Sequence, residues 1–509
     1  MNLGRLLKTI DLQAHSPEEE AQTIGSIHYD SRDVAPGGLF VAIEGFKIDG
    51  HDFVHDAVQR GAAAIVAQHP VTADVPVYPV ADTRRALATL ADAFFGHPSR
   101  ELTLIGITGT NGKTTTTYIL ESILKKSGFN VGVIGTVNYR YNQKEFDNPV
   151  TTPESLDLQR IMREMKTDGV SHVVMEVSSH AIDLDRVFGC DLDVAVFTNL
   201  TQDHLDYHQD MQSYWQCKKR LFTEYLVAGH GPKTKAAVIN VDYPQGRELA
   251  REVACSCVAV GHSSENPVRP IEMDMGLQGI SGTISIRGNT FRFQTGLTGH
   301  HNLENVLCAA GAAVALNLPP RSIQAGIECI SIVPGRLQRV PGPTDRPVFV
   351  DYAHTPDALE NVLRALKALG PDRLICIFGC GGERDRAKRP MMGEISGRLS
   401  DLTIVTSDNP RTERPTAIIA DILPGLEAIG SLEYRPEDLG NGWREKGYVV
   451  EPDRRQAIRM GIEASQAGDI VVIAGKGHET YQIIGNQTLA FSDVEEAAAV
   501  IGGRKAGRE

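Results

Sequence analysis

The stretch LTLIGITGTNGKTTTTYILESILKKSG, residues 102–128, decides the fold class. A short apolar run typical of a buried strand leads into a glycine-rich loop, and apolar residues at helical spacing follow. This order predicts a phosphate loop, in which Lys113 supplies a charge and Thr114 a hydroxyl for Mg²⁺. The spacing is a variant, because Ile107 stands where the common pattern has glycine. The alternative is a glycine-rich turn with an incidental lysine.

Other apolar runs of strand length recur along the chain and alternate with helical segments. This alternation predicts an α/β protein built on mostly parallel sheets. The residues of 281–296 alternate around a Gly-Asn pair and predict a hairpin. The strand-length runs are 130–136, 171–179, 192–201, 235–241, 346–353, 372–380, 401–408 and 469–477.

The length and two polar segments predict three domains. At roughly 150 residues per domain, 509 residues correspond to about three. HPSREL (97–102) has the composition of a linker, and IVPGRLQRV (332–340) marks a second boundary. We therefore expect a smaller α/β domain over 1–97, a central phosphate-loop domain over 98–333, and a C-terminal Rossmann-like domain over 334–509.

Composition limits the possible partners and compartment. The chain is 41% apolar and 23% charged, which is ordinary for a globular protein, and its net charge is −13. Nucleic acids and anionic membranes are bound by basic surfaces, so we expect neither partner. The eight cysteines form no CxxC pair, the first 20 residues lack an apolar signal region, and no apolar run could span a bilayer. We therefore expect a cytoplasmic protein.

Several loops after predicted strands carry groups that can bind a cation. Glu176 ends one strand, and the segment after the next strand contains Asp203, His204, Asp206 and His208. Magnesium prefers carboxylates together with phosphate and water, so these positions are candidate ligands. A solvated glutamate and a polar helix start are the alternatives. By composition alone, Lys218, Lys219 and Arg220 predict an exposed basic helix face.

Two Thr-Pro pairs predict helix starts, with Thr152 and Thr355 as caps. In the C-terminal part, GCGGERDRAKRP (379–390) places four basic residues after a strand, which suggests an anionic ligand. SDNPRT (407–412) and GKGHET (475–480) end two further strands. Since open α/β sheets bind ligands at the carboxyl ends of their strands, we expect these three loops to converge.

Together these motifs resemble the Mur ligase family of peptidoglycan synthesis. The resemblance rests on GTNGKTT, MEVSSH, NLTQDHLDYH, HHNLEN, PGRLQ, DYAHTP and DNPR, in this order along nearly the whole chain. It implies an ATP-dependent ligase that converts a substrate carboxylate to an acyl phosphate. The amine of an amino acid then attacks, forming an amide with release of ADP and phosphate.

The resemblance also implies roles for individual residues. Lys113, His204 and Lys218 would be catalytic, with Lys218 matching the lysine that the family carbamylates. Thr114, Glu176, His204 and carbamylated Lys218 would hold Mg²⁺. The ATP contacts that it implies are Gly109, Thr110, Asn111, Gly112, Lys113, Thr114, Thr115, Asn302, Asn305, Arg336 and Asp351.

For the substrates, the resemblance implies UDP-N-acetylmuramoyl-L-alanyl-D-glutamate as acceptor and meso-diaminopimelate as incoming amino acid, with the protein expected to be a monomer. The acceptor contacts would be Ser31, Phe46, Lys47, Ile48, Thr151, Thr152, Ser178 and Arg186. The diaminopimelate contacts would be Arg384, Asp408, Asn409, Pro410, Arg411, Gly475 and Glu479.

Other functions stay open at this point. Lysine lacks the distal carboxylate of diaminopimelate, and an arginine fork is suited to bind that group, so Arg411 favours diaminopimelate over a lysine-adding ligase. A folylpolyglutamate synthase fits the N-terminal region and DNPR less well. A nucleotide-dependent switch or motor has little support, because paired acidic metal ligands are not in the usual place.

Overall fold

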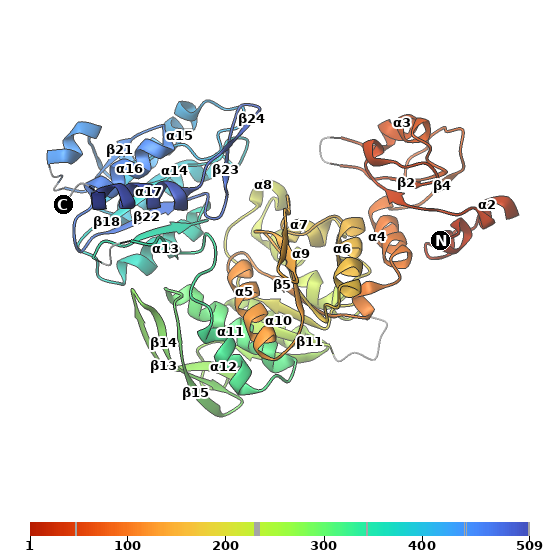
Figure 1. Cartoon of the computed structure of the whole chain (residues 1–509), viewed down its shortest axis with the longest axis horizontal. Coiled ribbons are helices and arrows are strands. Elements are labelled where there is room, and N and C mark those ends of the chain that lie inside the picture. Colours follow the sequence, from red (N-terminus) through yellow and green to blue (C-terminus); the bar gives the residue numbers. More distant parts are fainter. Residues whose placement is uncertain (46–47, 229–234, 343–344, 442, 444, 507–509) are drawn as a thin grey trace.

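The computed structural model describes residues 1–45, 48–228, 235–342, 345–441, 443 and 445–506. Figure 1 shows three bodies along the longest axis, with the N-terminal part at one end, the phosphate-loop part in the middle and the C-terminal part at the other end. Each body is built on its own sheet. None of the helices in these ranges is long and apolar enough to cross a membrane.

The N-terminal sheet is small and parallel. Its order is β1 (Ile27–His28), β2 (Leu39–Ala42), β3 (Ala64–Ala67) and β4 (Val77–Pro79). Every residue of β2 and β3 is buried, as expected for strands covered on both faces. The main helices of this part are α1 (Leu3–Lys8), α3 (Val54–Gln59) and α4 (Thr83–Phe94).

The central sheet has eleven strands, and its middle is parallel. The parallel strands run in the order β12 (Ser256–Val260), β11 (Ala236–Asn240), β10 (Val194–Phe197), β5 (Thr103–Thr108), β9 (His172–Glu176) and β6 (Val131–Ile134). At one edge β13 (Val268–Gly276) joins β12 in parallel, and β14 (Gly279–Ile286) and β15 (Asn289–Thr295) follow antiparallel. At the other edge β7 (Tyr139–Tyr141) and β8 (Lys144–Phe146) are antiparallel.

Two apolar cores lie on opposite faces of the central sheet. Along β5, Ile105 and Ile107 belong to one core, and Leu104 belongs to the other. The first core contains α5 (Lys113–Lys126), α11 (His300–Ala315) and α12 (Pro320–Glu328). The second contains α6 (Ser155–Thr167), α7 (Ser179–Asp183), α9 (Met211–Arg220) and α10 (Pro244–Glu252).

The C-terminal sheet repeats this architecture. Its parallel strands run in the order β17 (Val348–Asp351), β22 (Ile470–Ala474), β18 (Leu374–Phe378), β19 (Leu402–Val405), β21 (Gly447–Val450) and β20 (Leu432–Glu433), with β16 (Gln338–Arg339) antiparallel at one edge. One core contains α13 (Pro356–Lys367), α14 (Lys388–Leu399) and α15 (Pro415–Ala428). The other contains α16 (Arg454–Ala464) and α17 (Asp493–Ala506). The predicted α/β class with mostly parallel sheets is therefore confirmed.

Two local predictions need correction. The hairpin of β14 and β15 turns at Arg287-Gly288, both with positive φ, whereas the Gly-Asn pair was expected to form the turn. The cap of α6 is Glu154 and the helix begins at Ser155, so Thr152 does not cap it. Thr355 does cap α13, since its hydroxyl accepts from the Ala358 N–H.

Candidate active site

The phosphate loop leaves β5 and enters α5, and it is braced by the end of the neighbouring strand β10. The Thr110 N–H donates to the Asn199 carbonyl at 3.0 Å, and the Asn111 N–H donates to Asn199 Oδ1 at 2.9 Å. Thr198 Oγ1 donates to the Asn111 carbonyl at 2.7 Å. These bonds hold the loop in shape without using the side chains of Lys113 or Thr115.

Two glycines of the loop cannot be replaced without strain. Gly109 and Gly112 have φ of 150° and 85°, values that favour glycine. A Cβ on Gly109 would lie 1.9 Å from Thr198 Oγ1, and one on Gly112 would lie 2.1 Å from Asn305 Oδ1. The close approach of Asn305 places α11 against the loop.

Two lysines converge on one carbonyl of this loop. Lys113 Nζ and Lys218 Nζ each donate to the Gly109 carbonyl at 2.9 Å, and Lys113 Nζ also donates to the Thr110 carbonyl. Lys218 is 1% exposed, so the prediction of an exposed basic face is wrong for this residue. Burial lowers the pKa of Lys113, and burial together with the Lys113 charge lowers the pKa of Lys218 well below its usual value. A bound anion would favour the charged forms of these two lysines.

Glu176 is buried beside the loop and is not a solvated surface residue. Its Oε2 accepts from Thr114 Oγ1 at 3.0 Å and from Thr136 Oγ1 at 2.9 Å, while Oε1 accepts from the Thr136 N–H at 3.0 Å. It is 1% exposed. A buried carboxylate next to a hydroxyl offers the oxygen ligands that Mg²⁺ prefers, so these residues fit a magnesium ion next to a bound phosphate.

His204 stands at the turn before α8 (Leu205–His208). Its φ is 54°, and its N–H donates to Asp203 Oδ1 at 2.8 Å. Removal from water lowers the pKa of the imidazole, which favours the neutral form that can coordinate a metal. His208 is buried against the ring of Tyr214, 5.1 Å away, and does not line the cavity described next.

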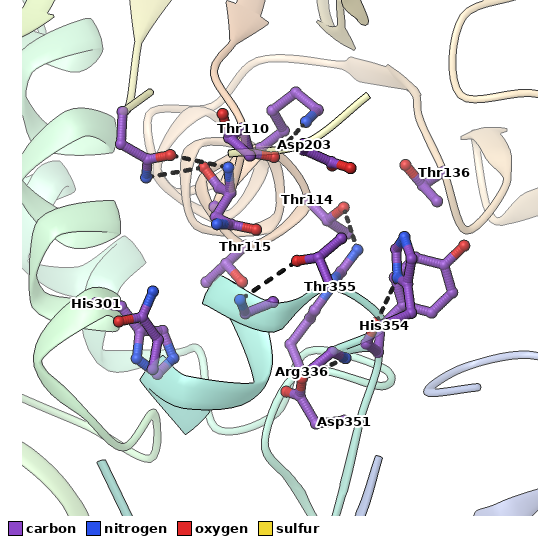
Figure 2. A pocket seen from close by; sticks show the side chains of 18 of the residues that line it. Thr110, Thr114, Thr115, Thr136, Asp203, His301, Arg336, Asp351, His354 and Thr355 are labelled. Atoms are coloured by element: carbon purple, nitrogen blue, oxygen red, sulfur yellow. Dashed lines mark hydrogen bonds between the residues drawn. The ribbon is translucent and has the colours of Figure 1, made fainter. Parts of the chain in front are cut away.

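A cavity between the central and C-terminal bodies collects these groups. Figure 2 shows Arg336 reaching across it to Thr114, with Asp351, His354 and Thr355 on the same side. Arg336 Nη2 donates to Thr114 Oγ1 at 3.1 Å, and the guanidinium lies 4.7 Å from the Tyr352 ring centroid. The predicted residues that line the cavity are Thr110, Asn111, Gly112, Lys113, Thr114, Thr115, Thr151, Glu176, Ser178, His204, Asn302, Asn305, Arg336 and Asp351.

Asp351 lines the cavity, but both of its oxygens are engaged by the backbone. Oδ2 accepts from the Leu337 N–H at 2.6 Å and Oδ1 from the Ala353 N–H at 2.8 Å. Burial raises the pKa of this carboxyl. Asp351 therefore holds the turn that carries Arg336. Asn302 and Asn305 form a second fixed pair, since Asn305 Nδ2 donates to Asn302 Oδ1 at 3.1 Å.

Sequence reasoning assigned no role to several lining residues. Some stand inside quoted motifs, such as His301 in HHNLEN and His354 in DYAHTP, and Asp203 was a candidate ligand only. Burial lowers the pKa of His354. Asn199 begins the NLTQDHLDYH motif, whereas Thr136 lies outside the quoted motifs and acts through its bonds to Glu176. The other missed lining residues are Tyr352, Ala353, Ala358, Asn361 and Val362.

The residues expected to bind the acceptor fall into two groups. Thr152 Oγ1 donates to the Glu176 carbonyl at 2.9 Å and accepts from the Ser178 N–H at 3.1 Å. Arg186 Nη1 donates to the Thr152 carbonyl at 3.1 Å, and Thr151 Oγ1 lies 3.1 Å from Thr136 Oγ1. This group therefore adjoins Glu176. It explains why Thr152 is not a helix cap, since the end of β9 engages its hydroxyl.

The second group lies in the N-terminal body, away from the cavity. Ser31 begins a short helical turn and is buried, whereas Ile48 is 64% exposed. Neither residue lines the cavity between the other two bodies. Phe46 and Lys47 lie outside the described residues.

Three loops of the C-terminal sheet converge as predicted. Arg411 Nη1 donates to the Gly382 carbonyl at 2.8 Å, and Asn409 Nδ2 donates to Glu479 Oε2 at 2.8 Å. Gly475 has φ of 114°, and a Cβ there would lie 2.5 Å from Asp408 Oδ2. Pro410 is equally close packed, because a Cβ on Gly382 would lie 1.9 Å from its carbonyl oxygen.

The basic segment of 384–389 is less free than its composition suggested. Arg389 is fully buried and pairs with Glu413 and Asp421, and Arg386 also pairs with Glu413. Lys388 Nζ donates to the His354 carbonyl at 2.7 Å. Within the described part of the chain, neither Arg384 nor Lys388 forms an ion pair, and Arg384 is exposed.

Known proteins share this architecture and much of this sequence. Three family models match: Mur ligase family, catalytic domain, over residues 23–95; Mur ligase middle domain over 107–313; and Mur ligase, glutamate ligase domain, over 335–477. The UDP-N-acetylmuramoyl-L-alanyl-D-glutamate–2,6-diaminopimelate ligase of Geobacter metallireducens is 49% identical over 481 residues, 94% of each chain. The ligase of the same name from Bacillus velezensis is 43% identical over 98% of this chain and 99% of that protein.

Solved structures agree with the sequence matches. A structure of a UDP-N-acetylmuramoyl-L-alanyl-D-glutamate–2,6-diaminopimelate ligase covers 99% of this chain and 100% of its own, with a TM-score of 0.68 and 30% identity. The MurF ligase of Thermotoga maritima, solved in complex with ADP, shares the fold at 18% identity and a TM-score of 0.63, covering 95% of this chain and 98% of its own. The phosphate-loop cavity and these matches along nearly the whole length show that the chain belongs to the Mur ligase family of ATP-dependent, amide-forming ligases.

Proposed function

We propose that this ligase joins meso-diaminopimelate to UDP-N-acetylmuramoyl-L-alanyl-D-glutamate, using ATP and releasing ADP and phosphate. The observation that carries the proposal is the DNPR loop, in which Arg411 meets Gly382 of the loop after β18 and Ile484 of the strand β23 (Tyr481–Ile484), which follows the loop after β22. The names of the relatives at 49% and 43% identity support the same reaction.

The phosphate-loop cavity is proposed to hold ATP. The backbone amides of Thr110 to Thr115 and the α5 N-terminus would bind the phosphates, and Lys113 would leave the Gly109 and Thr110 carbonyls for them. Asn302, Asn305, Arg336 and Asp351 would complete the nucleotide site, with Asp351 acting through the turn that carries Arg336.

Thr114, Glu176, His204 and carbamylated Lys218 are proposed to hold Mg²⁺. The metal would neutralise phosphate charge and orient the oxygens that react. Lys218 is suited to carbamylation, because its lowered pKa favours the neutral amine, which is the form that adds to CO₂. The carbamate would place an anion in place of this neutral amine, next to Lys113.

The proposed reaction has two steps, and the chain's residues position the reactants in each. In the first, an oxygen of the acceptor carboxylate attacks the γ-phosphorus and the bond to ADP breaks, while Lys113 and Arg336 stabilise the negative charge. In the second, the amine attacks the acyl carbon, loses a proton, and phosphate departs. Thr151, Thr152, Ser178 and Arg186 would hold the acceptor next to Glu176, and Ser31 and the 46–48 segment would bind its UDP end.

The C-terminal loops are proposed to select the amino acid. Arg384, Asp408, Asn409, Pro410, Arg411, Gly475 and Glu479 would form this pocket. Arg411, Arg384 and the Asn409 amide would bind the distal carboxylate, and Glu479 the ammonium group beside it. In a lysine-adding ligase the two arginines would have no distal carboxylate to bind.

We also propose the domain limits 1–97, 98–333 and 334–509, since each range contains one of the three main sheets. The protein is proposed to act as a monomer. It is proposed to act in the cytoplasm, where ATP and a UDP-linked precursor would be supplied.

The test is ADP release with the UDP-linked dipeptide and a panel of amino acids. We expect release only when acceptor and amino acid are both present, and a kcat/KM for meso-diaminopimelate at least ~10²-fold above that for L-lysine, because lysine would leave Arg411 and Arg384 without a carboxylate partner. Arg411→Ala should raise KM for diaminopimelate and leave KM for ATP unchanged. Equal use of lysine by the unaltered protein would contradict the proposal.

A further inference from the structure

Lys476 is a buried cation that the proposed reaction does not yet use. It follows β22 and lies between Gly475 and Gly477, whose φ values are 114° and 54°. These two flanking glycines, both with positive φ, turn the chain so that the Lys476 side chain points into the protein. Lys476 is 0% exposed, which is unusual for a lysine unless its charge is paired.

The partners of Lys476 are two residues of the proposed amino-acid pocket. Its Nζ donates to Asn409 Oδ1 at 3.0 Å and to Glu479 Oε2 at 2.7 Å. Asn409 Nδ2 donates to the same Glu479 oxygen at 2.8 Å. The three side chains therefore form a closed triangle across two loops that are 67 residues apart in sequence.

This triangle fixes the orientation of the Asn409 amide. Oδ1 accepts from Lys476 Nζ and from the Ile483 N–H at 3.0 Å, so both lone pairs are used. Rotating the amide by 180° would place Nδ2 against these two donors and Oδ1 against the Glu479 carboxylate. Both contacts would be repulsive, so the observed orientation is enforced.

The same triangle determines which hydrogen-bonding groups of Asn409 and Glu479 remain available to a ligand. Among the hydrogen bonds in the described part of the chain, Oε2 of Glu479 takes two and Oε1 takes none, and Asn409 keeps one amide hydrogen. One anionic oxygen and one amide donor, side by side, match the ammonium and the carboxylate of an amino-acid centre.

We infer that Lys476 is a positioning residue of the amino-acid pocket: it locks the Asn409 amide and holds Glu479 so that one oxygen faces the ammonium of the incoming amino acid. The inference rests on the proposed function and adds a residue to its pocket. Lys476 itself touches no substrate, because its ammonium is enclosed by Asn409, Glu479 and the Tyr481 ring 5.5 Å away.

The test compares Lys476→Met with the matched control Lys446→Met in the full-length enzyme. Lys446 is an exposed lysine of the same body, with Nζ 3.9 Å from Asp401. For Lys476→Met we expect KM for meso-diaminopimelate to rise about 10- to 150-fold, the range for losing one charge-assisted hydrogen bond, with KM for ATP and for the UDP-linked acceptor within twofold. Lys446→Met should change none of the three.

Two further variants separate positioning from folding. Lys476→Gln keeps an N–H donor without the charge, and we expect an intermediate rise in KM for diaminopimelate. In the Glu479→Gln background, adding Lys476→Met should raise KM for diaminopimelate by less than a further threefold. A residue that acts through Glu479 loses its effect once that carboxylate is gone.

Three results would overturn the inference: an unchanged KM for diaminopimelate in Lys476→Met, an equal rise for all three substrates, or full additivity in the double variant. The unaltered enzyme is first assayed with the amino-acid panel. Failure to use diaminopimelate at that stage would overturn the proposed function, whereas normal use followed by any of these three results would overturn only the role of Lys476.

Discussion

At the scale of single residues, the site depends on two buried lysines without a carboxylate partner, an arrangement that is rare in proteins. Lys218 and Lys113 donate to the same Gly109 carbonyl, and neither has a carboxylate partner within hydrogen-bonding distance in the described residues. The composition of KKR could not predict this, because it does not show which side of α9 lies against the phosphate loop. Lys219, one position later, instead pairs with Glu248 at 3.1 Å and with Glu252.

The adjacent lysines give a matched test. We expect Lys218→Ala to lower kcat by about 10² or more, because the proposed carbamate would be lost from the site where phosphoryl charge develops. Acetate should partly restore activity, and sodium chloride at equal ionic strength should not. Lys219→Ala should keep nearly full turnover. The measurement is steady-state ADP release, and a fully active Lys218→Ala enzyme would exclude the role.

Another buried basic residue, Arg454, supports the backbone of the amino-acid pocket. It pairs with Asp493 at 2.7 Å, both side chains being fully buried, and donates to the carbonyls of Ser407 and Ala474. These carbonyls directly precede Asp408 and Gly475. Arg454→Met should lower the free energy of unfolding by about 3–5 kcal/mol, because Asp493 would be left buried without a partner.

The neighbouring Arg455 serves as control for this prediction. Its pair with Glu496 is exposed, so Arg455→Met should cost no more than about 1 kcal/mol. Urea denaturation of the two variants measures the difference. Equal losses would mean that the buried pair contributes no more than the exposed one.

At the scale of elements, sequence patterns predicted the features that depend on nearby residues and missed those that depend on contacts with other helices or strands. The strand-length apolar runs at β5, β9, β10 and β22 were correctly predicted as strands. A strand that is buried on both faces is apolar along its whole length, so the pattern is visible in the sequence. The cap of α13 was also predictable, since Thr355 bonds within its own helix. The start of α6 was not, because Thr152 bonds instead to β9, 24 residues away.

One of these strands carries a histidine whose burial has a measurable consequence. His172, the first residue of β9, is buried with its ring 3.9 Å from that of Phe129. Burial lowers its pKa from 6.5 to about 4. Between these two values the unfolded chain binds a proton that the folded chain does not, so stability falls as the pH is lowered through this window.

We therefore expect His172→Phe to weaken the pH dependence of folding. Between pH 6.5 and 4.5, the free energy of unfolding should fall by on the order of 1–2 kcal/mol less in the variant than in the unaltered protein. Replacing the exposed His55 by Phe should not change the slope, because that ring stays in water in both states. Urea denaturation at the two pH values measures this change in the free energy of unfolding. The same change in all three proteins would refute the prediction.

At the scale of the whole molecule, the central and C-terminal bodies meet at the phosphate loop itself. Asp357 of α13 accepts from Asn111 Nδ2 at 2.9 Å and from Thr201 Oγ1 at 2.8 Å through the same oxygen. Asn111 and Asp357 are 246 residues apart. No periodicity or motif spacing predicts such a contact, so the sequence could indicate three bodies and their strand-end loops but not how the bodies meet.

This contact predicts a role for Asp357 in keeping the active-site cavity closed. Asp357→Ala removes both hydrogen bonds to a charged acceptor, each worth about 1.5–3 kcal/mol, so the C-terminal body should separate more readily from the loop. We expect kcat to fall about 10- to 100-fold while KM for diaminopimelate changes less than threefold, because that pocket lies wholly within the C-terminal body. Glu360→Ala on the same helix, whose partners Arg364 and Arg398 belong to the same body, is the control.

Solution scattering measures directly whether the two bodies separate, which an activity assay cannot do. The Asp357→Ala protein should have a larger radius of gyration than the unaltered protein without nucleotide, and the Glu360→Ala protein should not. Since α13 begins at Pro356, Asp357 lies in the first turn of the helix, and its loss should leave the Thr355 cap in place. A lowered kcat with an unchanged radius would assign Asp357 to the shape of the phosphate loop, whereas an unchanged kcat would show that Arg336 and Thr114 are sufficient to hold the two bodies together.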